Sequence, residues 1–410
     1  MRHHFITQKL NVSIIQYTKL NVGTGTEKAV LNFSRYYPRD KFNLTIYQTD
    51  KGSQQNLTED EVQSYLNGTE LITLSSIDAR FRLSEIINSE ESGKFERAFA
   101  RLFSTFLTVT VRPLLNVVIN KNKLRKIYDS HIIYIYDAEN AGFVPFNLTH
   151  SLIIGCMRGT YEDVLQGGKH SKLTKRTVQL LYAIIMRKIT VFHFLTKKLM
   201  DSSIIHKKIE FVQHSGVDIS LFQPELKVSS SVIKFLFSGN LNKKKGVLIA
   251  IEAFKSIKRE DVELHICGNG ELADFARNAS INCNRIIYHE YKQGEELASI
   301  YRMCDILVFP TTAREQHPLV VVEALASGLF VITSLNLYGI FDTFYNEKAL
   351  VYCEPTTKGV NTAMLESMEN IDIIRKNKQM FSNLVLDYDW KNVTLKLFDK
   401  FEEIYYQLKK

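Results

Sequence analysis

Apolar and polar positions alternate in a regular order along the second half of the chain. Short β-rich runs stand at 235–239, 262–268, 285–291, 306–310 and 330–334, and segments with apolar residues at helical spacing lie between them, at 247–258, 271–278, 295–304 and 319–327. Strict alternation of strands and helices is typical of βαβ units, in which helices cover both faces of a parallel sheet. The pattern predicts a doubly wound, Rossmann-like α/β domain.

The first half shows the same pattern less regularly, with strand candidates at 11–18, 43–50, 131–137, 151–157 and 189–194. Two such domains in tandem would face a cleft at the carboxyl ends of their strands, where open α/β sheets bind ligands. Gly, Pro and a serine run replace periodic structure at 216–231, so the join is expected there. We predict two domains, 1–225 and 226–389, followed by a terminal helix at 390–410.

Composition fits this division and adds a charge asymmetry. A chain of 410 residues with 45% apolar side chains is long enough to form the hydrophobic cores of two or three domains. Residues 1–225 hold 29 Lys and Arg against 21 Asp and Glu, whereas 226–410 hold 23 of each. The excess is concentrated in two segments with helical apolar spacing, 97–126 and 169–188. They predict either peripheral contact with an anionic membrane or ordinary amphipathic helices with solvated basic faces.

Several classes of protein are disfavoured. The N-terminus lacks the apolar core of a signal peptide, and Arg112 and Pro113 break the longest apolar segment, so we expect a cytoplasmic chain without a spanning helix, associated at most with the inner face of the membrane. The five cysteines lack C-x-x-C spacing, which predicts buried, reduced thiols rather than a metal site. The basic segments lack interleaved exposed aromatics, so no nucleic acid is expected as a partner.

Three glycine-containing loops follow predicted strands and are candidates for ligand contact. Lys245 and Gly246 end the loop NLNKKKG and open directly into a helix, where exposed amides and an ammonium would act on one phosphate. Gly268 and Gly270 would let a ligand approach the backbone closely, and Gly25 precedes a helix expected to start near Thr26. In each case, a solvated or purely structural turn is the alternative.

The stretch REQHPLVVVEALASG, residues 314–328, places two carboxylates eight positions apart. Pro318 is suited to the first position of a helix, because its fixed φ and missing N–H cost nothing there. Glu315 would then lie in the loop before the helix, and Glu323 would lie inside a helix that is apolar almost all round. A carboxylate in such a helix needs a partner, either a ligand hydroxyl or a Lys or Arg.

This stretch resembles the E-x7-E motif of retaining GT-B glycosyltransferases of the family 4 type, also called glycosyl transferases group 1. Further segments are similar to that family in the same order and spacing: GVDISLFQP at 216–224, SGNLNKKKGVLIAIEAF at 238–254, LHICGNG, EELASIYRMCDILVFPT and EALASGLFVITS. LDYDWKNVTLKLFDKFEEIY, at 386–405, resembles the terminal helix that crosses back to the N-terminal domain. The resemblance covers roughly 216–405, and more loosely 11–50.

The resemblance implies a glycosyltransferase that moves a sugar from a nucleotide-diphosphate donor to a glycan or lipid-linked acceptor, with retention at the anomeric carbon and without a metal or other cofactor. The N-terminal domain would receive the acceptor and the C-terminal domain the donor. Lys245 would bind the diphosphate, Glu323 the ribose hydroxyls and Glu315 the transferred sugar. The remaining implied donor contacts are Gln316, His317, Pro318 and Leu319 along phosphate and sugar, Gly268 and Gly270 beside the nucleotide, and Gly25 near the donor phosphate.

The sequence departs from the family pattern at two places. Asn240 stands where an arginine usually lies beside the diphosphate, so stabilisation of the leaving group would depend more on Lys245, with Lys243 or Lys244 as further candidates. Met157, at the end of the predicted strand 151–157, and Arg158, directly after it, stand where a histidine usually lines the sugar site. We predict Arg158 as the catalytic residue in that place, with His150 and His170 as alternatives.

The sequence also contains two candidate acceptor-site carboxylates and a D-x-D pair, and it leaves alternative functions open. Asp137 and Glu139 follow a predicted strand and are candidate acceptor-site carboxylates, with a solvated turn as the alternative. Asp387 and Asp389 form a literal D-x-D, but far from the phosphate loop in sequence, so we expect no metal site there. The departures leave two other functions open: a catalytically weak nucleotide-sugar-binding protein, and a sugar-nucleotide epimerase or hydrolase on the same scaffold.

Overall fold

The computed structural model describes residues 8–20, 25–50, 57–76, 112–136, 144, 148, 150–158, 176, 180, 183, 186–203, 205–225, 230–341, 346 and 348–409. The chain divides into two compact units: residues 1–214 with 394–410, and residues 215–393. The division falls after His214, whereas the sequence pattern predicted it after residue 225. Val217 and Phe222 pack into the core of the second unit, which explains why the preceding segment belongs to that unit.

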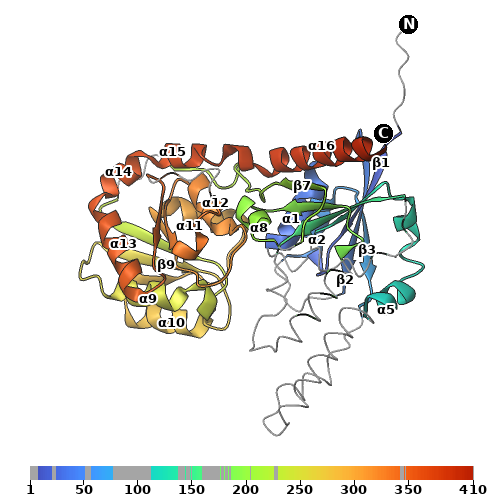
Figure 1. Ribbon diagram of the computed structural model, residues 1–410. Coiled ribbons are helices and arrows are strands. Elements are labelled where there is room, and N and C mark those ends of the chain that lie inside the picture. Colours follow the sequence, from blue (N-terminus) through green and yellow to red (C-terminus); the bar gives the residue numbers. More distant parts are fainter. Residues whose placement is uncertain are drawn as a thin grey trace. The chain divides into compact units, whose positions relative to one another are not determined.

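The first unit is built on a seven-stranded parallel sheet (Figure 1). Its strand order is β3-β2-β1-β4-β5-β6-β7. The strands are β1 (Leu10–Ile15), β2 (Phe42–Thr49), β3 (Glu70–Leu74), β4 (Ile132–Ile135), β5 (Leu152–Met157), β6 (Val191–Phe194) and β7 (Ile209–Val212). The helical elements are α1 (Gly25–Tyr36), α2 (Glu59–Leu66), α5 (Arg112–Ile119), the 3-10 turn η3 (Arg125–Asp129) and α8 (Lys197–Asp201).

The second unit is a six-stranded parallel sheet with strand order β10-β9-β8-β11-β12-β13. Its strands are β8 (Ile233–Ser238), β9 (Val262–Cys267), β10 (Ile286–Tyr288), β11 (Ile306–Phe309), β12 (Phe330–Ser334) and β13 (Leu350–Cys353). Its helices are α9 (Val247–Lys255), α10 (Ala273–Asn282), α11 (Gly294–Met303), α12 (Leu319–Ala326), α13 (Thr357–Glu369), α14 (Ile371–Lys376) and α15 (Lys378–Asn383), with 3-10 turns η5 (Lys243–Lys245), η6 (Leu335–Leu337) and η7 (Leu386–Tyr388). The predicted α/β class with two doubly wound domains is confirmed.

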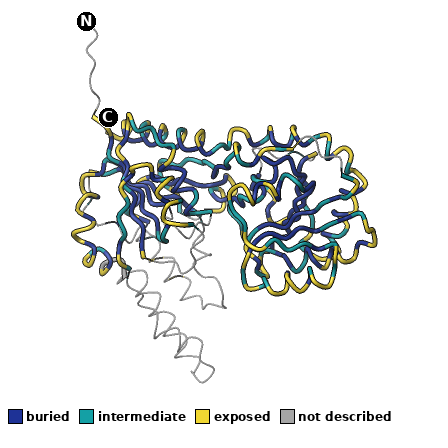
Figure 2. Tube along the Cα trace, turned by 180° about the vertical axis from the view of Figure 1, so that it is seen from behind, coloured by how far each residue is buried: buried dark blue, intermediate teal, exposed yellow. Residues whose placement is uncertain are grey.

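The core of each unit lies along the central strands of its sheet. Residues of β4, β5, β6, β11 and β12 are buried at every position, and Figure 2 shows the central strands as buried and the outer turns of the helices as exposed. Strands buried on both faces read as continuous apolar runs, which is the pattern the sequence shows. No helix within the described ranges has the length and the apolar character needed to span a bilayer.

The terminal helix α16 (Trp390–Lys409) returns the chain to the first unit from Thr394 onward. Phe398 packs edge-on against Phe42, with 5.1 Å between ring centroids, and Phe401 lies 4.9 Å from Tyr134. Lys41 pairs with Glu402 at 2.9 Å at the exposed margin of this contact. The aromatic side chains account for the docking, because an exposed ion pair contributes little.

A pair of histidines, His265 buried and His289 half-buried, joins β9 to the residue after β10. The two rings share a hydrogen bond of 2.8 Å between Nδ1 of His265 and Nε2 of His289. Nε2 of His265 lies 3.1 Å from a carboxylate oxygen of Glu263. The network assigns both rings as neutral, with His289 donating to His265 and His265 donating to Glu263. Burial, with the neighbouring ring and Lys292, lowers the pKa of His289 to about 4, and burial lowers the pKa of His265.

This pair makes the second unit sensitive to acid. A histidine whose pKa is lower in the folded than in the unfolded state stabilises the fold above pH 6.5, and this contribution is lost as the pH falls toward 4. We expect the free energy of unfolding to fall by about 1 to 2 kcal/mol over that window because of His289, after allowance for its partial exposure. His289→Gln should flatten this part of the curve in urea unfolding at pH 7.5, 6 and 5. An unchanged slope in the variant would contradict the assignment.

Candidate functional site

The loop after β8 folds back onto the end of β11. Asn242 caps the turn η5, because its side-chain oxygen accepts the backbone N–H of Lys245 at 2.9 Å. Gly246 then takes a left-handed conformation, with φ of 85°, and α9 begins at the next residue. A Cβ at Gly246 would lie 2.1 Å from the carbonyl oxygen of Pro310. A side chain is thus excluded at Gly246, and the start of α9 is held against the carboxyl end of β11.

The same crossing brings Lys245 to Glu315. Nζ of Lys245 lies 2.6 Å from Oε1 of Glu315, and the Thr311 hydroxyl donates to the same oxygen at 3.1 Å. The carbonyl oxygen of Lys244 accepts the backbone N–H groups of Thr312 and Ala313, at 2.7 and 3.1 Å. The loop after β11 is therefore wrapped around the lysine turn. The ammonium of Lys245 and the carboxylate of Glu315, which are 70 positions apart in the sequence, thus meet beyond the carboxyl end of β11.

The structure separates the three consecutive lysines of the loop. Lys243 and Lys244 are exposed, whereas Lys245 is partly buried and its ammonium lies 5.7 Å from the centre of the Phe309 ring. The sequence left all three as candidates for anion contact. The geometry favours Lys245, because only its position is fixed by a carboxylate and an aromatic face.

Gly268 and Gly270 are required by contact between two loops. Their φ angles are 147° and 153°, and a Cβ at Gly268 would lie 1.9 Å from the carbonyl oxygen of Gly239. A Cβ at Gly270 would lie 2.7 Å from both the side-chain oxygen of Asn240 and the carbonyl oxygen of Leu241. The space beside these glycines is thus filled by the loop after β8, which supports the structural alternative for them. Their place beside a nucleotide stays a prediction.

Glu323 has a partner that the sequence analysis did not consider. The hydroxyl of Tyr301, from α11, donates to Oε2 of Glu323 at 3.1 Å. Burial and the nearby Glu323 carboxylate raise the pKa of Tyr301 well above its usual value, so the hydroxyl stays protonated. Glu323 itself is half-buried rather than fully buried. The predicted alternatives were a ligand hydroxyl and a Lys or Arg, and the structure shows a hydroxyl of the protein, that of Tyr301, as one partner.

The segment between the two glutamates forms the start of α12. Pro318 occupies the capping position and Leu319 is the first helical residue, one position later than predicted. His317 is buried, and its ring is stacked on Tyr388 at 6.2 Å with 14° between the planes. Gln316 is half-buried beside it. Stacking at His317 fixes the backbone of this segment.

The predicted residues of the first unit are placed less fully. Gly25 is the first residue of α1. Arg158 follows β5, and its guanidinium carbon lies 5.0 Å from the centre of the buried Tyr136 ring. Asp137 and Glu139 lie outside the described residues, and so does His170. Among the residues that the structure describes, His, Cys, Asp and Glu form no group of three or more suited to a metal ion.

Thr311 and Tyr301 were missed by the sequence analysis. Thr311 stands four residues before Glu315, at the end of a strand, which is a position where a hydroxyl reaches a following loop. Tyr301 carried no such signal, because it lies in a helix 22 residues before the glutamate that it contacts.

Comparison with known proteins shows what the second unit and the fold resemble. Residues 219–380 match the family model described as "Glycosyl transferases group 1", which covers most of the second unit. Solved structures share the fold over nearly the whole chain. The Anabaena protein HepE in complex with UDP and glucose is 11% identical, with a TM-score of 0.67, and the match covers 95% of this chain and 99% of that one. The sucrose-phosphate synthase of Thermosynechococcus elongatus is 13% identical, with a TM-score of 0.69, over 97% and 100%.

A curated relative brings the comparison closer in sequence. The lipopolysaccharide 1,2-N-acetylglucosaminetransferase of Salmonella typhimurium is 25% identical over 199 residues, which are 44% of this chain and 49% of that protein. The match thus spans about half the length of this relative. Together, the family model and the structures support a glycosyltransferase of group 1 on the GT-B fold.

Proposed function

We propose that the protein transfers a sugar from a nucleotide-diphosphate donor to a glycan or lipid-linked acceptor, with retention of the anomeric configuration, as enzymes of family 4 do. The observation that carries the proposal is the meeting of Lys245 and Glu315 at 2.6 Å. The pair lies beside the start of α9, where backbone amides favour an anion. A diphosphate and a sugar hydroxyl need this combination of an ammonium and a carboxylate. HepE, which shares the fold, is described in complex with UDP and with UDP-glucose.

Each donor contact has a proposed role. Lys245 binds the diphosphate, Glu315 the hydroxyls of the transferred sugar and Glu323 the ribose, with Tyr301 orienting the Glu323 carboxylate. The backbone of 316–319 lies along phosphate and sugar, and Asn240 is the polar side chain beside the diphosphate. Gly268 and Gly270 border the nucleotide, and Gly25 is a further proposed contact of the donor phosphate.

Catalysis on this proposal depends on position and charge. As the bond between the anomeric carbon and the diphosphate breaks, negative charge grows on the departing oxygen, and Lys245 with the amides at the start of α9 stabilises it. A metal ion is not needed for this, so turnover should survive EDTA. Arg158, which follows β5, is the proposed catalytic residue at the place where the family has a histidine.

The first unit is proposed to receive the acceptor. Asp137 and Glu139 are its proposed acceptor carboxylates, and the basic excess of residues 1–225 would favour an anionic or membrane-borne acceptor. On this proposal the protein acts in the cytoplasm, and it contacts the inner face of the membrane if the acceptor is membrane-borne.

The experiment is release of nucleoside diphosphate from a panel of nucleotide sugars, with and without a membrane lipid extract. Lipid-stimulated release from one donor, with the sugar recovered on lipid, would support a transferase and identify its donor. Tight binding of a nucleoside diphosphate with no release from any donor would contradict it and favour a binding protein. Release to free sugar without dependence on lipid would indicate a hydrolase.

A further inference from the structure

Among the described side chains of helix α5, Val117 packs against the core, but other aliphatic side chains face outward while an asparagine is buried. Asn116 and Asn120 are each 1% exposed, whereas Val118 is 68% exposed and Leu115 and Ile119 are 40% and 48% exposed. Residues three and four positions apart share a helix face, so the three exposed aliphatic side chains form one patch. A surface helix usually buries its apolar face. The arrangement leaves an aliphatic patch in water, which needs an explanation.

Hydrogen bonds fix this orientation. The side chain of Asn120 pairs with the backbone of Ser75, accepting its N–H at 2.9 Å and donating to its C=O at 2.8 Å. Leu124 and Ile127, which follow the helix, are buried in the core of the first unit. Rotating α5 to bury the patch would break both bonds to Ser75 and leave buried polar groups unsatisfied. The outward aliphatic patch is therefore a stable property of the fold.

The patch is followed by a basic segment. Residues 112–128 contain five Lys and Arg and no Asp or Glu. Lys123 donates to the carbonyl oxygen of Thr73 at 2.7 Å and Lys126 pairs with Glu70 at 2.5 Å, so these two are held at the surface of the unit. Lys121 and Arg125 are exposed as well. Figure 1 shows α5 at the margin of the first unit. Glu70 opposes the charge of Lys126, and the exposed Asp129 follows, so Lys121 and Arg125 are the cations left beside the aliphatic patch. Aliphatic side chains next to exposed cations fit a surface that is apolar within and anionic outside.

We propose that α5 and the basic segment after it dock the protein on an anionic lipid membrane, with Leu115, Val118 and Ile119 entering the headgroup boundary and Lys121 and Arg125 contacting lipid phosphates. The inference deepens the proposed function, on which the membrane would carry the acceptor. Three short side chains bury too little area to hold a protein alone, so binding should be reversible and dependent on lipid charge.

The test measures cosedimentation of the full chain with vesicles, separately from catalysis. Wild type should bind vesicles that contain phosphatidylglycerol and bind phosphatidylcholine vesicles weakly. Joint replacement of Leu115, Val118 and Ile119 by Ser should reduce binding to background. Joint Lys121→Gln and Arg125→Gln should weaken it by about fivefold for each charge. Ile281→Ser is the matched control, because Ile281 is 75% exposed on α10 of the second unit, and it should bind like wild type.

The results of the vesicle-binding test can be distinguished from the results of the donor-turnover test. The free energy of unfolding in urea should be unchanged in all these variants, since the replaced side chains are exposed. The affinity for a nucleoside diphosphate should be unchanged as well, since none of the residues belongs to the donor site. Equal binding of wild type and the triple Ser variant would overturn the proposal, even if sugar transfer is established. A triple variant that alters a monomer–dimer equilibrium but not vesicle binding would assign the patch to a second copy of the chain. Vesicle binding without any donor turnover would instead count against the proposed function.

Discussion

Glu315→Gln should lower sugar transfer by about 100-fold or more while strengthening the binding of nucleoside diphosphate. Loss of one well-placed charged contact to the reacting sugar costs about this much. The carboxylate also holds Lys245 at 2.6 Å. Its removal frees the ammonium for the diphosphate, so affinity for nucleoside diphosphate should rise, by up to about fivefold for a partly exposed pair. Turnover and affinity should therefore change in opposite directions, which isothermal titration and a release assay can show.

Lys245→Ala provides the contrast, since it should weaken both nucleoside-diphosphate affinity and turnover. Lys243→Ala is the matched control, because Lys243 is an exposed lysine of the same turn, and it should stay within about twofold of wild type. If Glu315→Gln lost diphosphate affinity along with turnover, the assignment of Glu315 to the sugar and Lys245 to the phosphate would be wrong.

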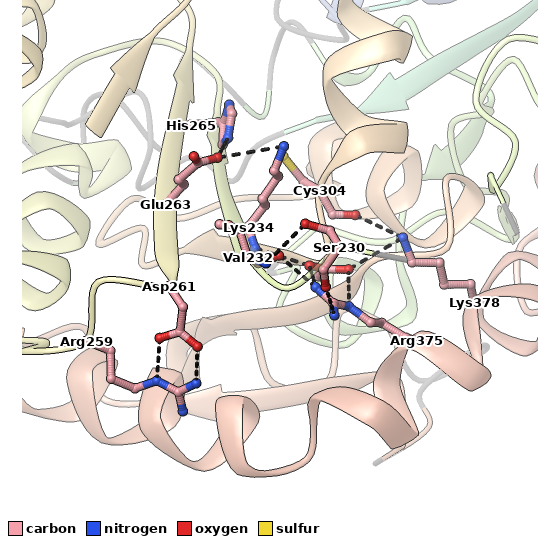
Figure 3. A network of polar contacts seen from close by, with 11 residues as sticks. Ser230, Val232, Lys234, Arg259, Asp261, Glu263, His265, Cys304, Arg375 and Lys378 are labelled. Carbon is pink, nitrogen blue, oxygen red and sulfur yellow. Dashed lines mark hydrogen bonds and ion pairs between the residues drawn. The ribbon is translucent and has the colours of Figure 1, made fainter. Parts of the chain in front are cut away.

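The second large effect is on stability, and it involves Asp305 at the amino end of β11. Asp305 forms ion pairs with Arg375 and Lys378, two residues of α14 and α15 that are labelled in Figure 3. Both carboxylate oxygens of Asp305 accept from Arg375, at 3.1 and 2.9 Å, and one lies 3.6 Å from Nζ of Lys378. Arg375 also donates to the carbonyl oxygens of Ser230 and Val232, at 2.6 and 2.8 Å.

Asp305→Ala should reduce the free energy of unfolding by about 3 to 5 kcal/mol, because it leaves the buried ammonium of Lys378 without its counter-charge. Urea unfolding with a probe in the second unit measures the change. Asp261→Ala is the control: it breaks an ion pair with Arg259 in which both side chains are nearly half exposed, so it should cost less than about 1 kcal/mol. A loss of similar size in both variants would show that burial does not decide the effect.

The central strands were predictable from sequence and most edge strands were not. β8, β9, β11 and β12 are flanked by strands on both sides, so their apolar runs are nearly continuous. β3, β7 and β13 lie at sheet edges, and most of their positions are half-buried. An edge strand needs fewer apolar side chains, so its sequence does not stand out from a loop.

The site was predicted as a set of positions, and its internal contacts were not. The E-x7-E spacing and the lysine turn identified Glu315 and Lys245, but no sequence pattern states that the two side chains meet. Tyr301 beside Glu323, and the packing of the glycine loops on each other, depend on which helices and strands become neighbours. Such contacts follow from tertiary structure, which no local spacing encodes.

The way the chain enters and leaves the second unit has a consequence for how such proteins can diversify. Val217 donates its N–H to the carbonyl oxygen of Tyr388 at 2.8 Å, and Trp390 donates to the carbonyl oxygen of Val217 at 3.1 Å. A Cβ at Gly216 would lie 2.6 Å from the Trp390 ring, so the two ends are in direct contact. A segment with adjoining ends can be exchanged as one cassette without opening either sheet. If the second unit binds the donor, as proposed above, donor preference could therefore be inherited, or engineered, as a module.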